Sequence, residues 1–261
     1  MDIILHQLML YVDSHPEEGT YKTLANLMIE HIDELAGMTI YDMADCFFVS
    51  PATLSRFCRM LGYNNFSHFK DKLQAPYGFQ VDYTPEYLSG TYEQSLAYLQ
   101  NQTLECLQNM RRHLSVQTLE EIARLIHDYQ NVYIAGYMGY ELLFMYLQQK
   151  LGLFRKFIHV TPASSTPVNR KNDYGPTDLV IMISLRGSPF TQKTLLSALI
   201  QNNVPRILIS QNTNAYYKEH YDRFFVIGGT PDNNLGMISL QFFIDELILT
   251  YYHLYKSELI L

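Results

Sequence analysis

A helical segment between residues 50 and 61 combines hydroxyl side chains with arginines. Its apolar residues recur with the period of an α-helix, so one face of the segment must pack inward. The opposite face is left with small hydroxyls and two guanidinium groups, which donate hydrogen bonds to base edges and phosphates in a DNA major groove. We therefore predict that the outward residues contact DNA: Ser50, Thr53, Ser55, Arg56 and Arg59.

Two short helices joined by a tight turn are expected to position this face. Thr39 is a candidate cap for the first helix, and the turn and its core contacts are expected to be filled by Phe47, Phe48 and Val49. Ser50 can cap the second helix, with Pro51 at its first position, where the missing N–H of proline costs nothing. Gly62 is predicted to end that helix.

Basic residues are concentrated in this part of an otherwise acidic chain. The net charge is −7, and residues 1–77 carry five Lys/Arg against ten Asp/Glu. Four of those five bases lie between positions 56 and 72. A basic stripe on an acidic body predicts modest non-specific DNA affinity with strong salt dependence. Arg59, Lys70 and Lys72 are expected to contact phosphates, although the acidity by itself can simply keep the protein soluble.

The segment 43–73 resembles the N-terminal helix-turn-helix of RpiR-type transcriptional regulators. That family shows the pattern S-x-x-T-x-x-R-F-x-x-x-L-G-[FY], followed by a Phe-rich helix. The resemblance implies a regulator that binds DNA, whereas the alternative is a small helical domain whose arginines are merely solvated. The residues that match are Ser50, Thr53, Arg56, Phe57, Leu61, Gly62, Tyr63, Phe66 and Phe69.

Two further helices are expected to precede the motif and to form the floor on which it packs. The first covers residues 2–13 and is broken before Pro16, because the residue before proline avoids helical geometry. The second is predicted to run from Thr20, as its cap, to about Ala36, since apolar residues recur over that range with helical spacing.

The second half of the chain has the pattern of an α/β domain. A Pro- and Gly-containing linker at 78–90 is predicted to separate domain 1–77 from domain 91–261. Thr118 and Glu121 resemble a capping box at the start of a helix. Apolar strands then alternate with helices, which predicts a doubly wound, five-stranded parallel sheet covered on both faces. The expected strands are residues 131–136, 157–160, 178–184, 205–210 and 223–228.

This half resembles the SIS (sugar isomerase) domain, the usual partner of the RpiR-type helix-turn-helix. The resemblance implies that two turns at the carboxyl ends of strands hold the phosphate of a sugar phosphate, using free backbone N–H groups. The first turn has the family pattern G-x-G-x-S. Gly136 matches it, but Met138 replaces the second glycine and Tyr140 replaces the serine, which would narrow a standard pocket.

The second turn has the family pattern S-x-S-G-x-T and departs from it as well. Arg186 stands in place of the middle serine, and two extra residues precede the threonine. Arg186 can bind an anion bidentately in place of the lost hydroxyls, or it can pair with a carboxylate so that the site no longer takes a sugar phosphate. We assign to the ligand site Gly136, Tyr140, Ser184, Arg186, Gly187, Ser188 and Thr191.

The leading interpretation is a DNA-binding transcriptional regulator that senses a phosphorylated sugar or similar anion. The resemblance implies a homodimer or higher homo-oligomer, which would read a palindromic double-stranded operator. One alternative is a sugar-phosphate isomerase-like enzyme with Glu141 or His159 as its base, although neither lies in a recognisable catalytic constellation. The other is a regulator whose SIS-like domain binds no ligand and serves only for dimerisation.

Several other classes of function find no support in the sequence. Cys46, Cys58 and Cys106 form no CxxC and no metal-ligand spacing, so we expect reduced thiols and predict neither a metal nor a cofactor. Cys46 and Cys58 lie on helix faces expected to pack, which predicts that these two are buried. The N-terminus lacks the basic region of a signal peptide, and no apolar run approaches the roughly 20 residues of a membrane span. We therefore predict a cytoplasmic protein without a membrane partner.

Overall fold

The computed structural model divides the chain into two compact units, Met1–Gln80 and Val81–Leu261. Each unit has its own hydrophobic core. The predicted linker at 78–90 lies outside the described residues except for Gly90. The structure describes residues 2–74, 90–136, 138–161, 174–187, 193–228 and 233–259.

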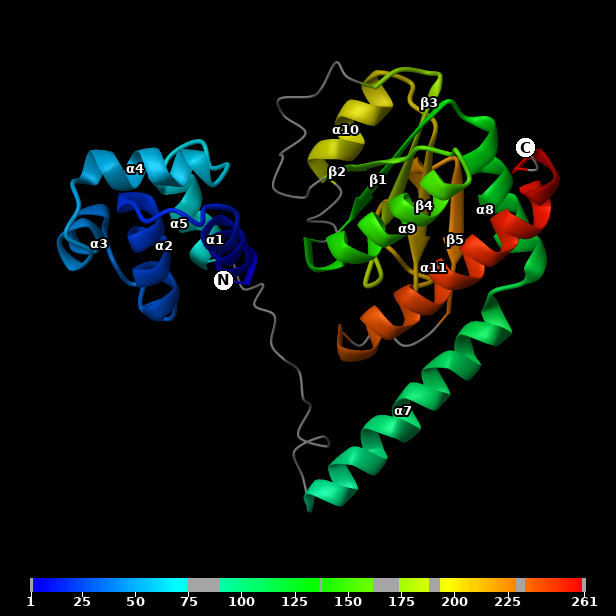
Figure 1. Cartoon of the computed structure of the whole chain (residues 1–261), viewed down its shortest axis with the longest axis horizontal. Helices are drawn as coiled ribbons and strands as arrows, with labels where there is room; N and C mark the ends of the chain where they lie inside the picture. Colours follow the sequence, from blue (N-terminus) through cyan, green and yellow to red (C-terminus); the bar gives the residue numbers. More distant parts are fainter. Residues whose placement is uncertain are drawn as a thin grey trace. The chain divides into compact units, whose positions relative to one another are not determined.

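The first unit is helical, as the sequence predicts. Its helices enclose one cluster of buried side chains, in which Met28 and Phe69 are among the largest that are fully buried. Gln7 joins the first helix to the motif, because its Nε2 donates to the carbonyl oxygen of Leu61 at 3.2 Å. The helices are α1 (Asp2–Ser14), α2 (Thr20–Glu30), α3 (Ile40–Cys46), α4 (Pro51–Met60) and α5 (Phe66–Gln74), and they appear in blue to cyan in Figure 1.

Helix α2 begins and ends differently from the prediction. Gly19 is its N-cap, without a side-chain hydrogen bond, and Thr20 is already its first helical residue. The helix ends at Glu30, and residues 31–37 form successive hydrogen-bonded turns. Leu35 is nevertheless fully buried. Apolar residues three or four positions apart fit either a helix or a series of turns, so their spacing alone did not locate the end of the helix.

The turn between α3 and α4 holds Phe48 in a left-handed conformation, with φ of 56°. Its side chain is 93% exposed, so the expectation that it contacts the core is wrong. Phe47, the residue before it, is buried as predicted. A positive φ turns the chain sharply, which sends one of two adjacent aromatic side chains inward and the other into solvent.

The second unit is an α/β domain with one parallel sheet in the order β2-β1-β3-β4-β5. Its strands are β1 (Asn131–Gly136), β2 (His159–Thr161), β3 (Asp178–Ile183), β4 (Arg206–Ser210) and β5 (Arg223–Val226). Its α-helices are α7 (Tyr92–His113), α8 (Val116–Asp128), α9 (Glu141–Leu153), α10 (Lys193–Gln201) and α11 (Asn233–Tyr255). Short 3-10 helices are η1 (Met138–Tyr140), η3 (Lys218–His220) and η4 (Lys256–Leu259).

Helices cover both faces of this sheet, which confirms the predicted doubly wound architecture (Figure 1). Successive side chains of β3 point to opposite faces of the sheet. Ile181 joins the larger core cluster with residues of α8, α9 and α11, whereas Val180 and Met182 join the smaller cluster with residues of α10. Such strands are apolar on both faces, and this accounts for their uninterrupted apolar sequence.

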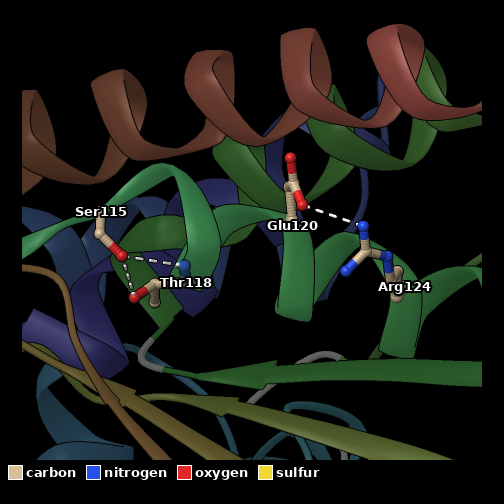
Figure 2. A network of polar contacts seen from close by, with 4 residues as sticks. All are labelled: Ser115, Thr118, Glu120 and Arg124. Atoms are coloured by element: carbon tan, nitrogen blue, oxygen red, sulfur yellow. Dashed lines mark hydrogen bonds and ion pairs between the residues drawn. The ribbon is translucent and has the colours of Figure 1, made fainter.

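Helix α8 shows how a hydroxyl fixes the start of a helix in this unit. Ser115 is its N-cap, and the Ser115 Oγ accepts a hydrogen bond from the Thr118 N–H at 3.1 Å (Figure 2). The capping box predicted for Thr118 and Glu121 is therefore wrong by one turn. Both Ser115 and Thr118 are good capping residues, and the sequence offered no means of ranking them. Further along, Arg124 donates to Glu120 at 2.9 Å.

Candidate functional site

Capping and packing fix the position of α4 within the first unit. The Ser50 Oγ accepts from the Thr53 N–H at 3.1 Å, and Pro51 follows at the first helical position, as predicted. Phe57 is fully buried and meets two rings, with Tyr11 edge-on at 5.1 Å and Tyr21 stacked at 5.5 Å. These contacts determine which side of α4 remains open to solvent.

Helix α4 is terminated by Gly62, whose backbone has a positive φ. Gly62 has φ of 96°, and the Tyr63 N–H returns to the Cys58 carbonyl at 3.0 Å. The Tyr63 hydroxyl then donates to Gln7 Oε1, which ties this end to α1. Cys58 itself is buried, and burial raises the pKa of its thiol to about 12, so it stays protonated and unreactive.

The arginines of α4 lie on the side opposite its buried stripe. Arg56 and Arg59 are both exposed, as is Ser50, whereas Thr53 and Ser55 are half-buried. The sequence prediction overlooked Ala52, an exposed residue in the first turn of the same face. Alanine can make apolar contact with thymine methyl groups, but nothing in the sequence distinguishes an alanine that contacts DNA from one that only supports the helix.

Lys70 does not present its charge in the expected way. Its Nζ donates to the carbonyl oxygens of Leu35 at 3.1 Å and of Met38. Burial lowers the pKa of this ammonium, and the nearby Asp42 carboxylate partly offsets that effect. Lys70 therefore stabilises the end of the turns after α2 rather than standing free for a phosphate. Lys72, in the last turn of α5, is exposed.

The first predicted ligand turn is tightly packed. Gly136 pairs in register with Ile183, and a Cβ at Gly136 would come within 2.7 Å of the Phe144 ring and 2.8 Å of the Ile183 carbonyl oxygen. The backbone packing therefore requires glycine at this position. Tyr140 is buried, with its ring edge-on to Phe144 at 6.5 Å. A large aromatic side chain thus occupies space beside the end of β1.

The second predicted ligand turn is held by the loop that follows β4. Gly187 has φ of +67°, and a Cβ there would lie 2.5 Å from the Ala215 Cα. The Tyr216 N–H donates to the Gly187 carbonyl at 3.0 Å, and Asn212 Nδ2 donates to the Arg186 carbonyl at 2.9 Å.

Exposure differs sharply between Ser184 and Arg186, two predicted ligand residues of this turn. Ser184 is buried, whereas the Arg186 side chain is exposed at the edge of the sheet where β1 and β3 end. Ser188 and Thr191 lie outside the described residues.

The two candidate bases for an isomerase are not brought together. Glu141 begins α9, just after the carboxyl end of β1. His159 begins β2 and stacks on Tyr133, in the middle of β1, at 4.8 Å. Among the described residues, no group of three His, Cys, Asp or Glu side chains is placed to hold a metal ion.

A buried amide near the second turn was missed by the sequence prediction. Gln211 directly follows β4, is 5% exposed, and donates its backbone N–H to the Leu185 carbonyl at 3.1 Å. Within the described part of the chain, neither its Nε2 nor its Oε1 has a hydrogen-bond partner. A glutamine in a polar SQNTN run carries no sign of burial, so sequence alone could not have identified it.

Comparison with known proteins identifies the first unit. A family model described as a helix-turn-helix domain of the rpiR family matches residues 13–78. Residues 13–78 form an RpiR-type helix-turn-helix domain. A curated relative, an HTH-type transcriptional regulator from Providencia stuartii, is 26% identical over 183 residues, which make up 66% of this chain. The chain spans 62% of the length of that relative.

Several solved structures resemble this chain in fold. The NanR protein of Vibrio vulnificus, complexed with ManNAc-6P, has a TM-score of 0.54 and 17% identity, covering 97% of this chain and 93% of that one. The sugar isomerase domain of an RpiR transcription factor from Sphaerobacter thermophilus has a TM-score of 0.55 and 17% identity, covering 64% and 94%. A protein of E. coli CFT073, solved in complex with a ligand, has a TM-score of 0.52 and 13% identity, covering 64% and 94%. The second unit therefore has a SIS-like fold.

Proposed function

We propose that this protein is a transcriptional regulator that binds DNA through α4 and responds to a phosphorylated sugar or similar anion bound by its SIS-like domain. The main support is the outward face of α4, where Arg56 and Arg59 are exposed opposite a buried apolar stripe within an RpiR-type domain. Bidentate donors on the accessible face of a fixed helix suit base and phosphate recognition.

Different contacts are proposed for the individual residues of this face. Arg56, Ser50, Thr53 and Ser55 belong to the side that approaches base edges, and Arg59 and Lys72 contact phosphates. Lys70 is left out of the interface because its ammonium is bonded to two backbone carbonyls. A contact to a phosphate contributes affinity without sequence preference, whereas a contact to a base edge discriminates between sequences.

The ligand is proposed to bind at the carboxyl ends of β1 and β3. These strands flank the point where the strand order reverses, and ligands of doubly wound sheets bind there. Ser184, Arg186 and Gly187 form the turn after β3, and the guanidinium of Arg186 supplies positive charge at this edge. The solved structure with ManNAc-6P lends support from a protein of the same fold. Ser188 and Thr191, which the sequence assigns to the same site, lie outside the described residues.

A homodimer is proposed to form through the outer faces of α9 and α11. Tyr146 donates to Asp245 at 2.9 Å, so the two faces adjoin. Large apolar side chains project around this pair, and an exposed apolar surface shared by two helices suits a self-complementary contact between two copies. Two copies would present two α4 helices to successive major grooves of a palindromic operator, about 34–36 Å apart. The exposed apolar residues are Leu142, Met145, Phe242, Leu249 and Tyr252.

We propose a role in the cytoplasm without catalysis. Operator binding requires access to the genome. His159 stacks on Tyr133 in the middle of β1, whereas Glu141 follows the carboxyl end of that strand, so we do not assign them as the acid–base pair of an isomerase. Among the described helices, none is both long and apolar enough to cross a membrane.

Selection of bound genomic fragments by the full-length protein, followed by fluorescence anisotropy, tests the DNA contact. Arg56→Ala should weaken binding to the selected sequence by about 1–3 kcal/mol and relax discrimination at one base position. Arg59→Ala should weaken binding to all sequences about equally. The slope of the logarithm of the binding constant against the logarithm of the salt concentration should become shallower by about 1, as expected for the loss of one phosphate contact.

Arg124→Ala is the matched control for this experiment. It removes an exposed arginine from α8 of the second unit and should leave DNA affinity unchanged. If Arg56→Ala and Arg59→Ala both bound the selected fragment as tightly as Arg124→Ala does, α4 would not be the recognition helix.

A further inference from the structure

The buried carboxamide of Gln211 is the described polar group whose environment is hardest to reconcile with a purely structural role. Its side chain is removed from solvent, and within the described part of the chain neither its Nε2 nor its Oε1 meets a partner. Burying an amide without hydrogen bonds is unfavourable, so native proteins rarely keep one unless something else satisfies it. Gln211 therefore requires a physical explanation that the fold by itself does not supply.

The backbone around Gln211, in contrast, makes hydrogen bonds to both neighbouring strand ends. The ladder of the parallel sheet continues past β4: the Gln211 N–H donates to the Leu185 carbonyl at 3.1 Å, and the Ile227 N–H donates to the Ser210 carbonyl at 3.0 Å. Side chains alternate along the strand, so Gln211 follows Ile207 and Ile209 onto the face that carries the larger apolar core. The amide is thus held at a fixed place beside apolar neighbours.

That place is the edge of the sheet where the ligand is proposed to bind. Leu185, whose carbonyl holds Gln211, belongs to the same turn as Ser184 and Arg186. The Leu185 side chain also packs against Gly236 in the first turn of α11. A Cβ added at Gly236 would lie 3.1 Å from the Leu185 Cδ1 and 3.5 Å from the Tyr140 hydroxyl oxygen. Gln211 consequently sits one strand away from the anion-binding turn, on the side covered by α11.

We propose that the Gln211 carboxamide recognises the hydroxyl groups of a phosphorylated sugar, while the turn after β3 holds its phosphate. This inference rests on the proposed function of the SIS-like domain and specifies which part of the ligand each group binds. A carboxamide offers two donors and an acceptor, and a sugar hydroxyl both donates and accepts. An ionised phosphate only accepts, so it would satisfy Nε2 and leave Oε1 unpaired. The site therefore selects a polyol phosphate over a simple phosphate.

Isothermal titration calorimetry of the full-length protein tests this assignment. The probes are ribose 5-phosphate, glucose 6-phosphate, N-acetylmannosamine 6-phosphate and inorganic phosphate. Gln211→Met keeps the volume of the side chain and removes both polar ends. It should weaken binding of the best sugar phosphate on the order of tenfold or more, since two neutral hydrogen bonds are lost, and should leave binding of inorganic phosphate unchanged.

Melting of the protein without ligand separates recognition from a structural role. Removing an unsatisfied buried amide should leave the melting temperature of Gln211→Met equal to or above that of the wild type. Gln148→Met is the matched control, because the Gln148 Nε2 donates to the Ile158 carbonyl at 2.7 Å. That variant should melt earlier and bind sugar phosphate normally.

The two measurements together distinguish a ligand-binding role of Gln211 from a structural one. If the wild type binds a sugar phosphate and Gln211→Met binds it equally well, the assignment of Gln211 is overturned while the proposed sensor function stands. A clearly lower melting temperature for ligand-free Gln211→Met would likewise overturn it in favour of a structural role. If the wild type binds none of the sugar phosphates, both the sensor function and this inference fail.

Discussion

At the scale of single residues, the same chemical group has different roles according to what surrounds it. The guanidinium of Arg59 is exposed on α4, whereas the ammonium of Lys70 is bonded to the carbonyls of Leu35 and Met38. A count of basic residues treats the two alike, but only a charge that is free to approach a phosphate contributes to DNA affinity. The basic stripe on this domain is accordingly narrower than composition implies.

The Asp42 carboxylate is expected to make the stability of the first unit depend on pH. Hydrogen bonds from Thr39, first from its hydroxyl and then from its backbone N–H, hold the pKa of this carboxyl below its ordinary value. Because the folded pKa lies below the unfolded one, the carboxylate adds stability above pH about 4, and this stability is lost as the pH falls through the folded pKa.

Asp42→Asn should therefore lower the melting temperature of the first unit at pH 7 by more than it does at pH 3. Differential scanning calorimetry of the full chain at both pH values measures the difference. A deficit of equal size at the two pH values would mean that the charge of Asp42 does not stabilise α3.

At the scale of elements, α11 has one face in the core and another in solvent. Phe243 and Leu247 are buried, while Phe242 and Leu249 are exposed on the side that adjoins α9. A helix that is apolar almost all round lacks a clear polar face, which is typical of helices buried on both sides. We proposed above that a second copy of the chain covers this outer apolar face, because a two-fold contact would place the same apolar surface on both sides of the interface.

The double variant Met145→Glu/Phe242→Glu tests this face. Both side chains are exposed in a single chain, 54% and 40% respectively, so the charges should leave the fold intact and separate a dimer into monomers. Val116→Glu places a charge on another exposed apolar residue, at the start of α8, and should leave the dimer unchanged. Sedimentation velocity measures the assembly state. A dimer that persists in the double variant would exclude this face as the interface.

At the scale of the whole molecule, regulation requires that the two units influence each other through assembly or ligand. A ligand shifts DNA affinity only to the extent that it binds the DNA-competent arrangement more or less tightly than the alternative. By linkage, DNA must change the affinity for the ligand by the same factor. The RpiR-type domain and the SIS-like domain thus form one regulator only if this reciprocal effect is measurable.

Local patterns predicted most of the fold and only part of the candidate site. Ser50, Pro51 and Gly62 fix α4 through interactions within a few residues, so the sequence was sufficient to place that helix. The burial of Tyr140 and of Gln211 depends on segments far away in the chain, which periodicity does not report. The same holds for Lys70, whose partners lie more than thirty residues earlier.

The most direct test is the affinity of the full-length protein for its selected DNA fragment, measured by fluorescence anisotropy with and without a saturating sugar phosphate that it binds. We expect the Kd for DNA to change by a factor of about 5–150, the usual range of coupling between sites. The Kd for the sugar phosphate should change by the same factor when DNA is present. An unchanged DNA affinity under saturating ligand would contradict the claim that the SIS-like domain governs DNA binding.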